Sequence, residues 1–420
     1  MKEKICVLGL GYIGLPTAAM FASNGYDIVG VDVNKNVIEA LNEGEIIIEE
    51  PYLDVMVREV VASGKLKAYN KPQIADVYII AVPTPINEDK TADMSYVISA
   101  TKSIVPLVKK GDIIILESTS PPGTTENIIM PILEESKLNV AEDLYVAHSP
   151  ERVIPGKILF ELVENNRIVG GINEESTKKV KKLYQAFVKG EIYTTNATTA
   201  EMCKLTENTF RDVNIAFANE LAIICEEMGI NVWDVIKYSN KHPRVNIHSP
   251  GPGVGGHCIA VDPWFIVEKY PDMAKLINLS RHTNDNMPEY VFGKSKRILG
   301  SLKDKKVTIL GITYKPDVDD MRESPIIELI SLLEDISGIT ISIYDPYVKN
   351  YKYLEKDVYT ACKDSDLVIL GVNHKVFNEI DMKKLYDNMG QANLLDTRNF
   401  YIEDELREIG FNYNLLGKGK

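Results

Sequence analysis

The stretch "VLGLGYIGLP", residues 7–16, decides the fold of this chain of 420 residues. Gly9, Gly11 and Gly14 stand there in G-x-G-x-x-G spacing, after an apolar run typical of a buried strand and at the start of a helix-like run. Glycines so spaced permit a tight turn, close approach of the backbone to a pyrophosphate, and packing of the helix on the strand. The N-terminus of the helix also points its N–H groups at an anion. The stretch therefore predicts a dinucleotide-binding turn.

The next strand-like run, "YDIVGVD" at 26–32, supports this interpretation. It ends on Asp32, near the offset of about 20 residues at which an acid binds the adenosine ribose. A carboxylate there repels a 2′-phosphate, so we expect NAD rather than NADP as the cofactor. Lys35 follows three residues later and would weaken that preference.

Alternating strand-like and helix-like segments extend outward from this turn. Short Ile- and Val-rich runs occur at 4–9, 26–32, 77–83, 112–118 and 144–151, with a sixth candidate strand, "NRIVGG", at 166–171. A second alternation has its strands at 306–311, 339–346, 366–374 and 393–399. Such alternation is typical of parallel sheets covered by helices. We expect an α/β fold class, with two doubly wound Rossmann-like domains joined by a long central helix.

The central helix is expected to begin at "TTAE", residues 198–201, where Thr198 and Glu201 have the spacing of a capping box, and to end near Gly229. Lys204, Asn208 and Arg211 lie on one face at i, i+4 and i+7. They are either a solvated stripe or a set of donors for an oxyanion or phosphate. Apolar positions beside them are expected to face a core: Met202, Leu205, Val213 and Phe217.

Composition excludes other classes of protein. No apolar run approaches the ~18 residues of a membrane span, and the N-terminus enters a strand without a signal-peptide core, so we expect a cytoplasmic protein. A net charge of −13 argues against nucleic acid as a partner. Five scattered cysteines and six scattered histidines predict neither disulfides nor a metal site.

The stretch "PGPGVGGHCIAVDP", residues 250–263, places Cys258 in a loop almost free of side chains. A free cysteine is often an inert packed thiol. Here the glycines would let the backbone approach a ligand, and His257 and Asp262 bracket the thiol with ionisable groups, which favours a nucleophile. A nucleophilic thiol beside an NAD site predicts oxidation beyond the aldehyde, through a thiohemiacetal and a thioester, with two NAD molecules used per substrate.

Seven stretches together resemble the UDP-glucose/GDP-mannose dehydrogenase family of nucleotide-sugar 6-dehydrogenases along nearly the whole chain. They are "GLGYIGLP", "ESTSPPGTT", "SPERVIPGK", "AEMCKLTENTFRDVNIAFANE", "KHPRVNI", "PGPGVGGHCIAVDPWF" and "YKPDVDDMRESP". The "HPR" and "GVGGHCIAVDPWF" stretches are most similar to members that oxidise UDP-N-acetyl-D-mannosamine at C6. The chain lacks the Gly-Tyr-Gly-Gly-x-Cys loop and the following Pro-Lys-Asp of many UDP-glucose dehydrogenases.

The resemblance implies roles for matching residues. Cys258 resembles the nucleophile, and Lys204 resembles the acid/base or oxyanion donor, with Asn208 beside it. Asp262 resembles an aspartate that handles the proton together with a water, and Glu151 resembles the carboxylate that positions the hydrolytic water. Thr119 completes the catalytic set. The NAD contacts are expected from Gly9, Gly11, Tyr12, Ile13, Gly14, Asp32, Lys35, Thr84, Thr119 and Arg322. The UDP-sugar contacts are expected from Arg152, Val153, Lys204, Asn208, Arg211, His242, Arg244, Gly255, Tyr314, Lys315 and Arg398, some from a partner subunit. Pro155 stands where many UDP-glucose dehydrogenases carry a second glutamate.

The expected organisation is an NAD-binding domain at 1–197, a central helical domain with the cysteine loop at 198–300, and a UDP-sugar-binding domain at 301–420. The expected activity is oxidation of UDP-N-acetyl-D-mannosamine to the uronate, for precursors of cell-surface polysaccharides, by a homodimer formed through the central helix. Three alternatives stay open: the same chemistry on UDP-N-acetylglucosamine or UDP-glucose, a two-electron hydroxyacid dehydrogenase, and a non-catalytic sensor of NAD or UDP-sugars.

Overall fold

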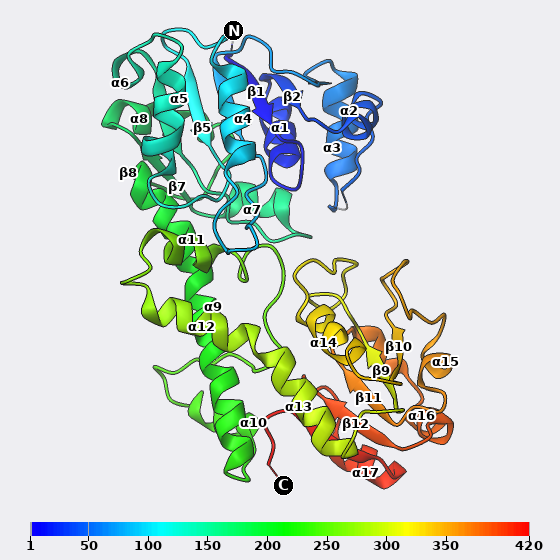
Figure 1. Cartoon of the computed structure of the whole chain (residues 1–420). Coiled ribbons are helices and arrows are strands. Elements are labelled where there is room, and N and C mark those ends of the chain that lie inside the picture. Colours follow the sequence, from blue (N-terminus) through cyan, green and yellow to red (C-terminus); the bar gives the residue numbers. More distant parts are fainter. Residues whose placement is uncertain (1, 49, 420) are drawn as a thin grey trace. The chain divides into compact units, whose positions relative to one another are not determined.

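The computed structural model describes residues 2–48 and 50–419. Two compact units are present, one of residues 1–207 and 264–270, the other of residues 208–263 and 271–420. Each contains a mainly parallel sheet with helices on both faces (Figure 1). The α/β fold class expected from the sequence is confirmed. No helix within the described ranges is long and apolar enough to cross a membrane.

The first unit contains, among its described residues, an eight-stranded sheet of order β3-β2-β1-β4-β5-β6-β7-β8. Its strands are β1 (Lys4–Leu8), β2 (Asp27–Val31), β3 (Leu66–Tyr69), β4 (Val77–Ile80), β5 (Ile113–Leu116), β6 (Tyr145–His148), β7 (Arg167–Gly171) and β8 (Ile192–Asn196). The candidate strand at 166–171 is confirmed as β7, but it pairs antiparallel to β6, whereas the other pairs are parallel. The carboxyl ends of β2, β1, β4, β5 and β6 therefore lie side by side at one edge.

Helices cover both faces of this sheet. Side chains of α1, α3, α7 and α8 pack into one core, and those of α4, α5 and α6 pack into the other. The helices of the unit are α1 (Gly14–Ser23), α2 (Lys35–Asn42), α3 (Leu53–Ala62), α4 (Ser95–Ile104), the π-helical segment η1 (Thr125–Ile129), α5 (Met130–Glu134), α6 (Val140–Asp143), α7 (Ile158–Glu164) and α8 (Glu174–Tyr184).

The long helix α9 (Ala197–Glu227) begins in the first unit and continues into the second. It ends as the sequence predicts, because Gly229 adopts φ +74° and the N–H of Ile230 donates to the carbonyl of Cys225 at 2.9 Å. Its buried residues Ala218, Ala222 and Cys225 pack on α10 (Val232–Ser239). Three further helices follow: α11 (Asp262–Lys269), α12 (Lys275–Asp285) and α13 (Met287–Leu299).

The second unit contains, within the described part of the chain, a five-stranded parallel sheet of order β10-β9-β11-β12-β13. Its strands are β9 (Lys306–Leu310), β10 (Thr340–Tyr344), β11 (Leu367–Leu370), β12 (Asn393–Asp396) and β13 (Asn412–Leu415). Side chains of α13 and α14 (Pro325–Glu334) pack on one face, and those of α15 (Val358–Cys362), η2 (Lys375–Glu379), α16 (Met382–Asn388) and α17 (Glu403–Ile409) pack on the other.

Candidate active site

The three glycines after β1 have separate functions in the structure. Gly9 adopts φ +93°, and a Cβ there would lie 2.5 Å from the carbonyl oxygen of Ala81. A Cβ on Gly14 would lie 1.9 Å from the carbonyl oxygen of Gly9, so only glycine lets α1 begin against the strand. A Cβ on Gly11 would meet no atom within 4 Å. Gly9 forms the turn, Gly14 permits the packing, and the open space beside Gly11 fits a dinucleotide phosphate.

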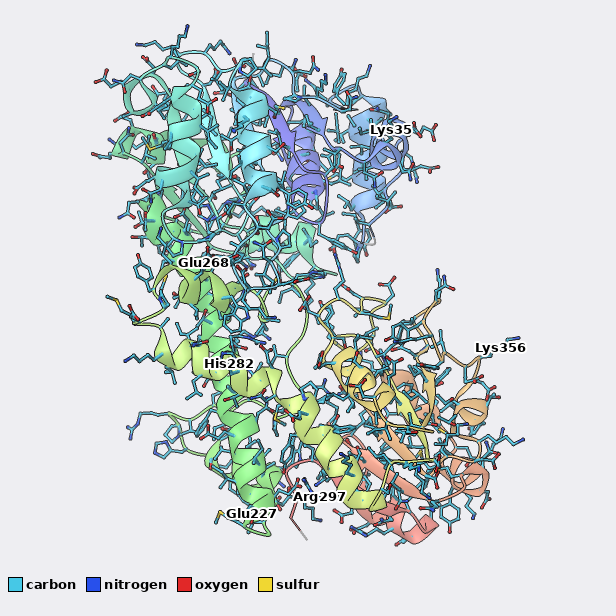
Figure 2. All side chains as sticks on the ribbon, in the orientation of Figure 1. Lys35, Glu227, Glu268, His282, Arg297 and Lys356 are labelled. Atoms are coloured by element: carbon cyan, nitrogen blue, oxygen red, sulfur yellow. The ribbon has the colours of Figure 1, made fainter. Side chains whose placement is uncertain are left out.

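Other predicted cofactor residues lie at the same edge of the sheet. Asp32 follows β2 and accepts hydrogen bonds from the N–H groups of Leu10 at 3.0 Å and Asn34 at 2.9 Å, which orient its half-buried carboxylate. The hydroxyl of Thr84 donates to the carbonyl of Thr119 at 2.6 Å, so the turns after β4 and β5 are joined. Tyr12 is 43% exposed and Ile13 half-buried at the start of α1. Lys35 begins α2 with an exposed side chain (Figure 2).

Glu151 follows β6 and is held by a buried arginine. Its Oε1 accepts the N–H of Arg152, and its Oε2 accepts Nη1 of Arg167, both at 2.7 Å. The Arg152 guanidinium pairs with Glu207 at 2.7 Å and donates to the carbonyl of Asn166, so part of its donor capacity is used within the chain. Val153, also expected at the substrate, is half-buried against the apolar core. Pro155 is exposed in the loop that follows.

The predicted capping box at the start of α9 is wrong. The side chain of Asn196 accepts the N–H of Thr199 at 2.8 Å and is the cap. Glu201 is buried and instead accepts the N–H of Gly123 at 2.5 Å and both the N–H and the hydroxyl of Thr125, at 2.8 and 2.6 Å. A carboxylate there satisfies the free N–H groups at the start of η1. It also fixes the loop that contains Thr119 to the helix that contains Lys204.

The polar stripe of α9 reaches one other predicted catalytic residue. The Asn208 amide donates to Oδ2 of Asp262 at 2.5 Å, and the Asp262 side chain is buried. Lys204 is half-buried and Arg211 is exposed. Of the expected core positions, Leu205 is fully buried and Met202 and Val213 are half-buried, but Phe217 is 50% exposed. The expectation that Phe217 faces a core is therefore wrong.

Cys258 lies one turn before α11 with an exposed side chain. Its carbonyl accepts the N–H of Asp262 at 2.8 Å and of Val261 at 3.1 Å, so the thiol and the carboxylate belong to one rigid turn. Because Asp262 is bonded to Asn208, that turn is fixed to α9. The second unit thus brings Asn208, Cys258 and Asp262 together.

The residue before the thiol contacts an acid that the sequence did not single out. His257 Nε2 lies 2.7 Å from Oδ2 of Asp320, and Arg322 donates to both oxygens of Asp320 at 2.9 and 3.0 Å. Partial burial raises the pKa of Asp320, but the hydrogen bonds from Arg322 and His257 outweigh it and hold that pKa well below its usual range. The acidic run "DVDD" was the available signal. This contact joins the cysteine loop to the segment with the predicted cofactor residue Arg322.

The glycines before Cys258 are needed for packing within the protein. A Cβ on Gly255 would lie 2.2 Å from the carbonyl oxygen of Glu323, and one on Gly256 would lie 2.7 Å from the ring of Tyr314. Gly253 and Gly256 also adopt φ of +129° and +86°. The sequence predicts that this glycine-rich loop lets the backbone approach a ligand closely. The structure adds that the segment 314–325 packs against the loop.

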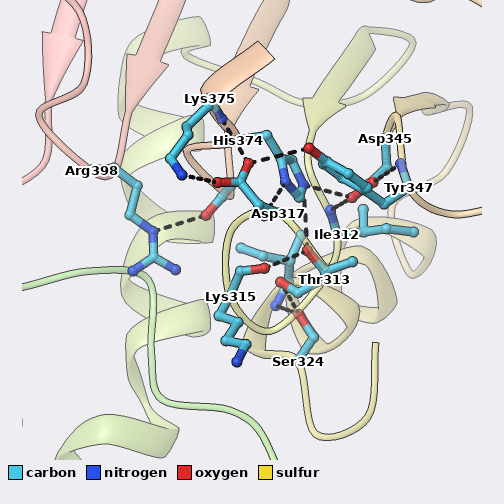
Figure 3. Close-up of polar contacts among 12 residues, drawn as sticks. Ile312, Thr313, Lys315, Asp317, Ser324, Asp345, Tyr347, His374, Lys375 and Arg398 are labelled. Atoms are coloured by element: carbon cyan, nitrogen blue, oxygen red, sulfur yellow. Dashed lines mark hydrogen bonds and ion pairs between the residues drawn. The ribbon is translucent and has the colours of Figure 1, made fainter. Parts of the chain in front are cut away.

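The second sheet repeats the acid arrangement of the first. Asp345 follows β10 and accepts the N–H groups of Ile312 at 2.8 Å and Tyr347 at 2.9 Å, as Asp32 does in the first sheet. Here, however, His374 Nε2 lies 3.1 Å from Asp345, and both side chains are fully buried (Figure 3). The sequence pattern singled out neither Asp345 nor His374 and did not predict that they pair.

His374 also holds the loop that contains the predicted substrate residue Lys315. The N–H of Asp317 donates to His374 Nδ1 at 2.9 Å, so the imidazole proton lies on Nε2 (Figure 3). Asp317 in turn accepts the N–H of Lys375 at 2.9 Å, and the hydroxyl of Thr313 donates to the carbonyl of Lys315 at 2.9 Å. These bonds fix the backbone on either side of Lys315.

A second predicted substrate cation lies after β12. Arg398 Nε donates to the carbonyl of Gly371 at 3.0 Å (Figure 3). A Cβ on Gly251 would lie 2.6 Å from Arg398 Nη1, so the guanidinium lies beside that glycine. Burial lowers the pKa of Arg398 to about 10, so it is charged at neutral pH. An arginine bonded to a carbonyl retains donors suited to a diphosphate. His242 and Arg244 are exposed in the turn after α10.

The fold and this site define a nucleotide-sugar dehydrogenase, and the chain belongs to the UDP-glucose/GDP-mannose dehydrogenase family. Its NAD binding domain model matches residues 3–188, its central domain 198–286, and its UDP binding domain 308–403.

Individual relatives are similar along nearly the whole chain. A UDP-N-acetyl-D-mannosamine dehydrogenase of Methanococcus maripaludis is 48% identical, with 99% of this chain and 97% of the relative covered. An NDP-N-acetyl-D-galactosaminuronic acid dehydrogenase of Ralstonia solanacearum is 45% identical, with 94% and 96% covered. The solved UDP-D-ManNAc dehydrogenase of Pyrococcus horikoshii superposes with a TM-score of 0.92 at 40% identity, covering 99% of both chains.

Proposed function

We propose that this chain is an NAD-dependent dehydrogenase that oxidises C6 of UDP-N-acetyl-D-mannosamine to the uronate in two successive steps. The names and full-length similarity of the relatives support this substrate. The observation that carries the chemistry is the exposed Cys258 in one turn with Asp262, whose carboxylate is bonded to Asn208 of α9. We assign the protein to the cytoplasm and to the synthesis of polysaccharide precursors.

The cofactor site is proposed at the carboxyl edge of the first sheet. Open space beside Gly11 receives the pyrophosphate, and the oriented carboxylate of Asp32 binds the adenosine ribose. The further contacts are those expected from the sequence: Tyr12, Ile13, Lys35, Thr84, Thr119 and Arg322. NAD, when bound, accepts the hydride in each oxidation.

The protein's own groups handle the covalent steps. Cys258 Sγ adds to the C6 aldehyde to give a thiohemiacetal, and Lys204 and Asn208 stabilise the developing oxyanion. Asp262, with a water, takes up the proton released at the thiol. After the second oxidation Cys258 is held as a thioester, and Glu151 positions the water that releases the acid. In the structure Cys258, Lys204 and Glu151 are at least partly exposed to solvent. The side chains of Asn208 and Asp262 are hydrogen-bonded to each other.

The UDP-binding residues 301–420 are proposed to supply the cations for the diphosphate. Lys315 and Arg398 would bind the diphosphate, since both are cations near the carboxyl ends of β9 and β12. The remaining contacts are proposed from Arg152, Val153, Lys204, Asn208, Arg211, His242, Arg244, Gly255 and Tyr314.

A homodimer is proposed through the central helix. Phe210, Phe217 and Ile224 follow one another at intervals of seven residues along α9, so they lie on one face, and they are 64%, 50% and 44% exposed. Leu276 and Leu279 of α12 are also exposed. Large apolar side chains on one face of a helix favour burial against another chain. A second copy is the occupant that the family resemblance implies.

The proposed function is tested by counting NADH on a panel of purified sugars. UDP-N-acetylmannosamine should give two NADH and one uronate per sugar and should have the highest kcat/KM. The panel includes UDP-N-acetylglucosamine, UDP-glucose and, because of the name of the Ralstonia relative, UDP-N-acetylgalactosamine. A better substrate among these three would overturn the assigned sugar. One NADH per sugar would indicate a simple dehydrogenase, and none a sensor.

A further inference from the structure

Glu151 is one end of a buried charge cluster in the first unit. The Arg167 side chain on β7 is 5% exposed and lies between two carboxylates. Its Nη1 contacts Glu151 Oε2 and its Nη2 contacts Glu117 Oε1, each at 2.7 Å. Glu117 follows β5 and its side chain is fully buried. We call Glu117, Arg167 and Glu151 the carboxylate–arginine cluster.

Further contacts fix the arginine in this position. Its Nε donates to the hydroxyl of Ser149 at 2.9 Å, and its guanidinium carbon lies 3.8 Å from the centroid of the Tyr184 ring. The Tyr184 hydroxyl donates to Glu117 Oε1 at 2.5 Å, and that of Thr17 donates to Oε2 at 3.3 Å. The guanidinium therefore contacts both carboxylates through one rigid, planar group.

Two buried carboxylates around one arginine carry an electrostatic cost that a single ion pair does not. A single buried ion pair already costs desolvation, and a second buried carboxylate adds an uncompensated charge whenever both are ionised. Only one end of the cluster, Glu151, is itself a predicted catalytic residue. The other end, Glu117, is enclosed by β7, α1 and α8, and no solvent reaches its carboxylate.

We propose that Glu117, acting through Arg167, is a positioning residue that sets the orientation of Glu151 and the charge around it in hydrolysis of the Cys258 thioester. This inference rests on the proposed function. In that step water forms a C–O bond to the acyl carbon and the C–S bond breaks. The water proton passes to Glu151, and the sulfur leaves as a thiolate that is protonated afterwards. Arg167 alone would neutralise the charge of Glu151, and the negative charge of Glu117 offsets this effect.

The electrostatics of the cluster fit this role. Burial raises the pKa of Glu117 to about 7, and the positive charge of Arg167 only partly opposes it. The groups facing Glu117 are Arg167 from β7, Tyr184 from α8 and, beyond the arginine, Glu151; His148 at the end of β6 has its pKa lowered to about 3 by burial and is neutral. Ionisation of Glu117 should therefore make hydrolysis faster as the pH rises through about 7.

The test variant is Glu117→Gln, which keeps the shape and the acceptor for Arg167 but removes the charge. Single-turnover experiments follow NADH formation, free uronate, and the mass of the Cys258 peptide after acid quenching. We expect NADH formation up to the thioester to be unchanged, uronate release to fall by about 10-fold, within the ~100-fold that misplacing a catalytic group can cost, and the acylated peptide to accumulate. The rise in hydrolysis rate near pH 7 should be lost.

Two further variants separate positioning from folding. Asp112→Asn removes a buried carboxylate at the other end of β5, where it pairs with Lys109 at 3.0 Å, and should leave both steps and the pH profile unchanged. Tyr184→Phe keeps the ring under Arg167 but removes a donor to Glu117, so the rise should move to higher pH.

Two outcomes would overturn the inference: wild-type uronate release and pH profile in Glu117→Gln, or an equal loss of both steps in Glu117→Gln and Asp112→Asn. A wild-type enzyme that forms no thioester adduct would instead contradict the proposed function.

Discussion

Residue type alone does not distinguish the reactive thiol from the other cysteines; exposure does. Cys6, Cys225 and Cys362 are buried, and Cys203 is half-buried. Burial raises the pKa of Cys6 to about 11 and of Cys362 to about 12, which suppresses their thiolates. Among the described cysteines only Cys258 is exposed. Cys6, Cys225 and Cys362 instead pack in hydrophobic cores.

Cys258→Ser should abolish formation of the uronate, because a serine hydroxyl is a far weaker nucleophile than a thiolate and no thioester can form. We expect a loss on the order of 10³-fold or more in uronate production. Mass spectrometry of the quenched enzyme checks for the absence of the acyl adduct. The Cys203→Ser variant is the control and should retain activity. Wild-type uronate production by Cys258→Ser would contradict the thioester route.

The raised pKa of Glu117 also predicts how stability depends on pH. In the unfolded chain Glu117 has its ordinary pKa of 4.5 and releases its proton above that pH. In the folded protein Glu117 keeps the proton until the pH reaches about 7. The contribution of Glu117 to the free energy of unfolding is therefore present below pH 4.5 and falls as pH rises towards 7. Urea unfolding of wild type and Glu117→Gln at several pH values measures it. The stability difference between the two proteins should change over that range and be constant above it.

At the scale of elements, the sequence predicted every central strand of the two described sheets and one edge strand, β10, and it missed the other three edge strands. β1, β2, β4, β5, β6 and β7 and four strands of the second sheet lie where continuous apolar runs predict them. β3, β8 and β13 were not predicted, and each is an edge strand. Edge strands have one exposed face and one exposed side, so "LKAY", "IYTTN" and "NYNL" mix buried and exposed residues and form no apolar run.

Local patterns failed where the partner is distant in sequence. Glu201 has the spacing of a capping box with Thr198, but its carboxylate binds residues 123 and 125 instead. Asp320 and His374 likewise acquire their functions from residues more than 50 positions away. Motif spacing carries no information about such contacts. By contrast, Gly14 packs against the carbonyl of Gly9 within the same short motif, so its role could be predicted from spacing alone.

The turn between β1 and α1 allows folding and cofactor binding to be separated. Gly11→Val should leave the melting temperature nearly unchanged, because its Cβ meets no atom, but it should weaken NAD binding at least about 10-fold by occupying the phosphate space. Gly14→Ala should instead lower the melting temperature, since its Cβ would collide with the Gly9 carbonyl. Calorimetric titration with NAD and thermal unfolding of both variants measure the two effects. Equal losses in both variants would contradict this division of roles.

At the scale of the whole molecule, the exposed apolar face of α9 is the feature that most needs a partner. Phe217→Asp combined with Ile224→Asp should convert a dimer to a monomer, because two charges in an apolar interface would each have to be desolvated. Sedimentation at several protein concentrations measures the mass. Phe160→Asp is the matched control, as Phe160 is 67% exposed on α7 and should leave the mass unchanged. A wild-type protein that sediments as a monomer would contradict the proposed dimer.

The proposed cofactor NAD and the proposed UDP-sugar substrate both contain a ribose and a diphosphate. The protein has two sheets of similar architecture, and each has an acid after its second strand. Asp32 stays half-buried at the first sheet, within reach of a sugar hydroxyl, whereas His374 encloses the matching Asp345 at the second. An open acid after the second strand of both sheets would give the two sheets similar ribose-binding groups. With the His374 imidazole against it and no exposed surface, the Asp345 carboxylate is closed to a sugar hydroxyl, so the second sheet lacks the open acid that follows β2 in the first.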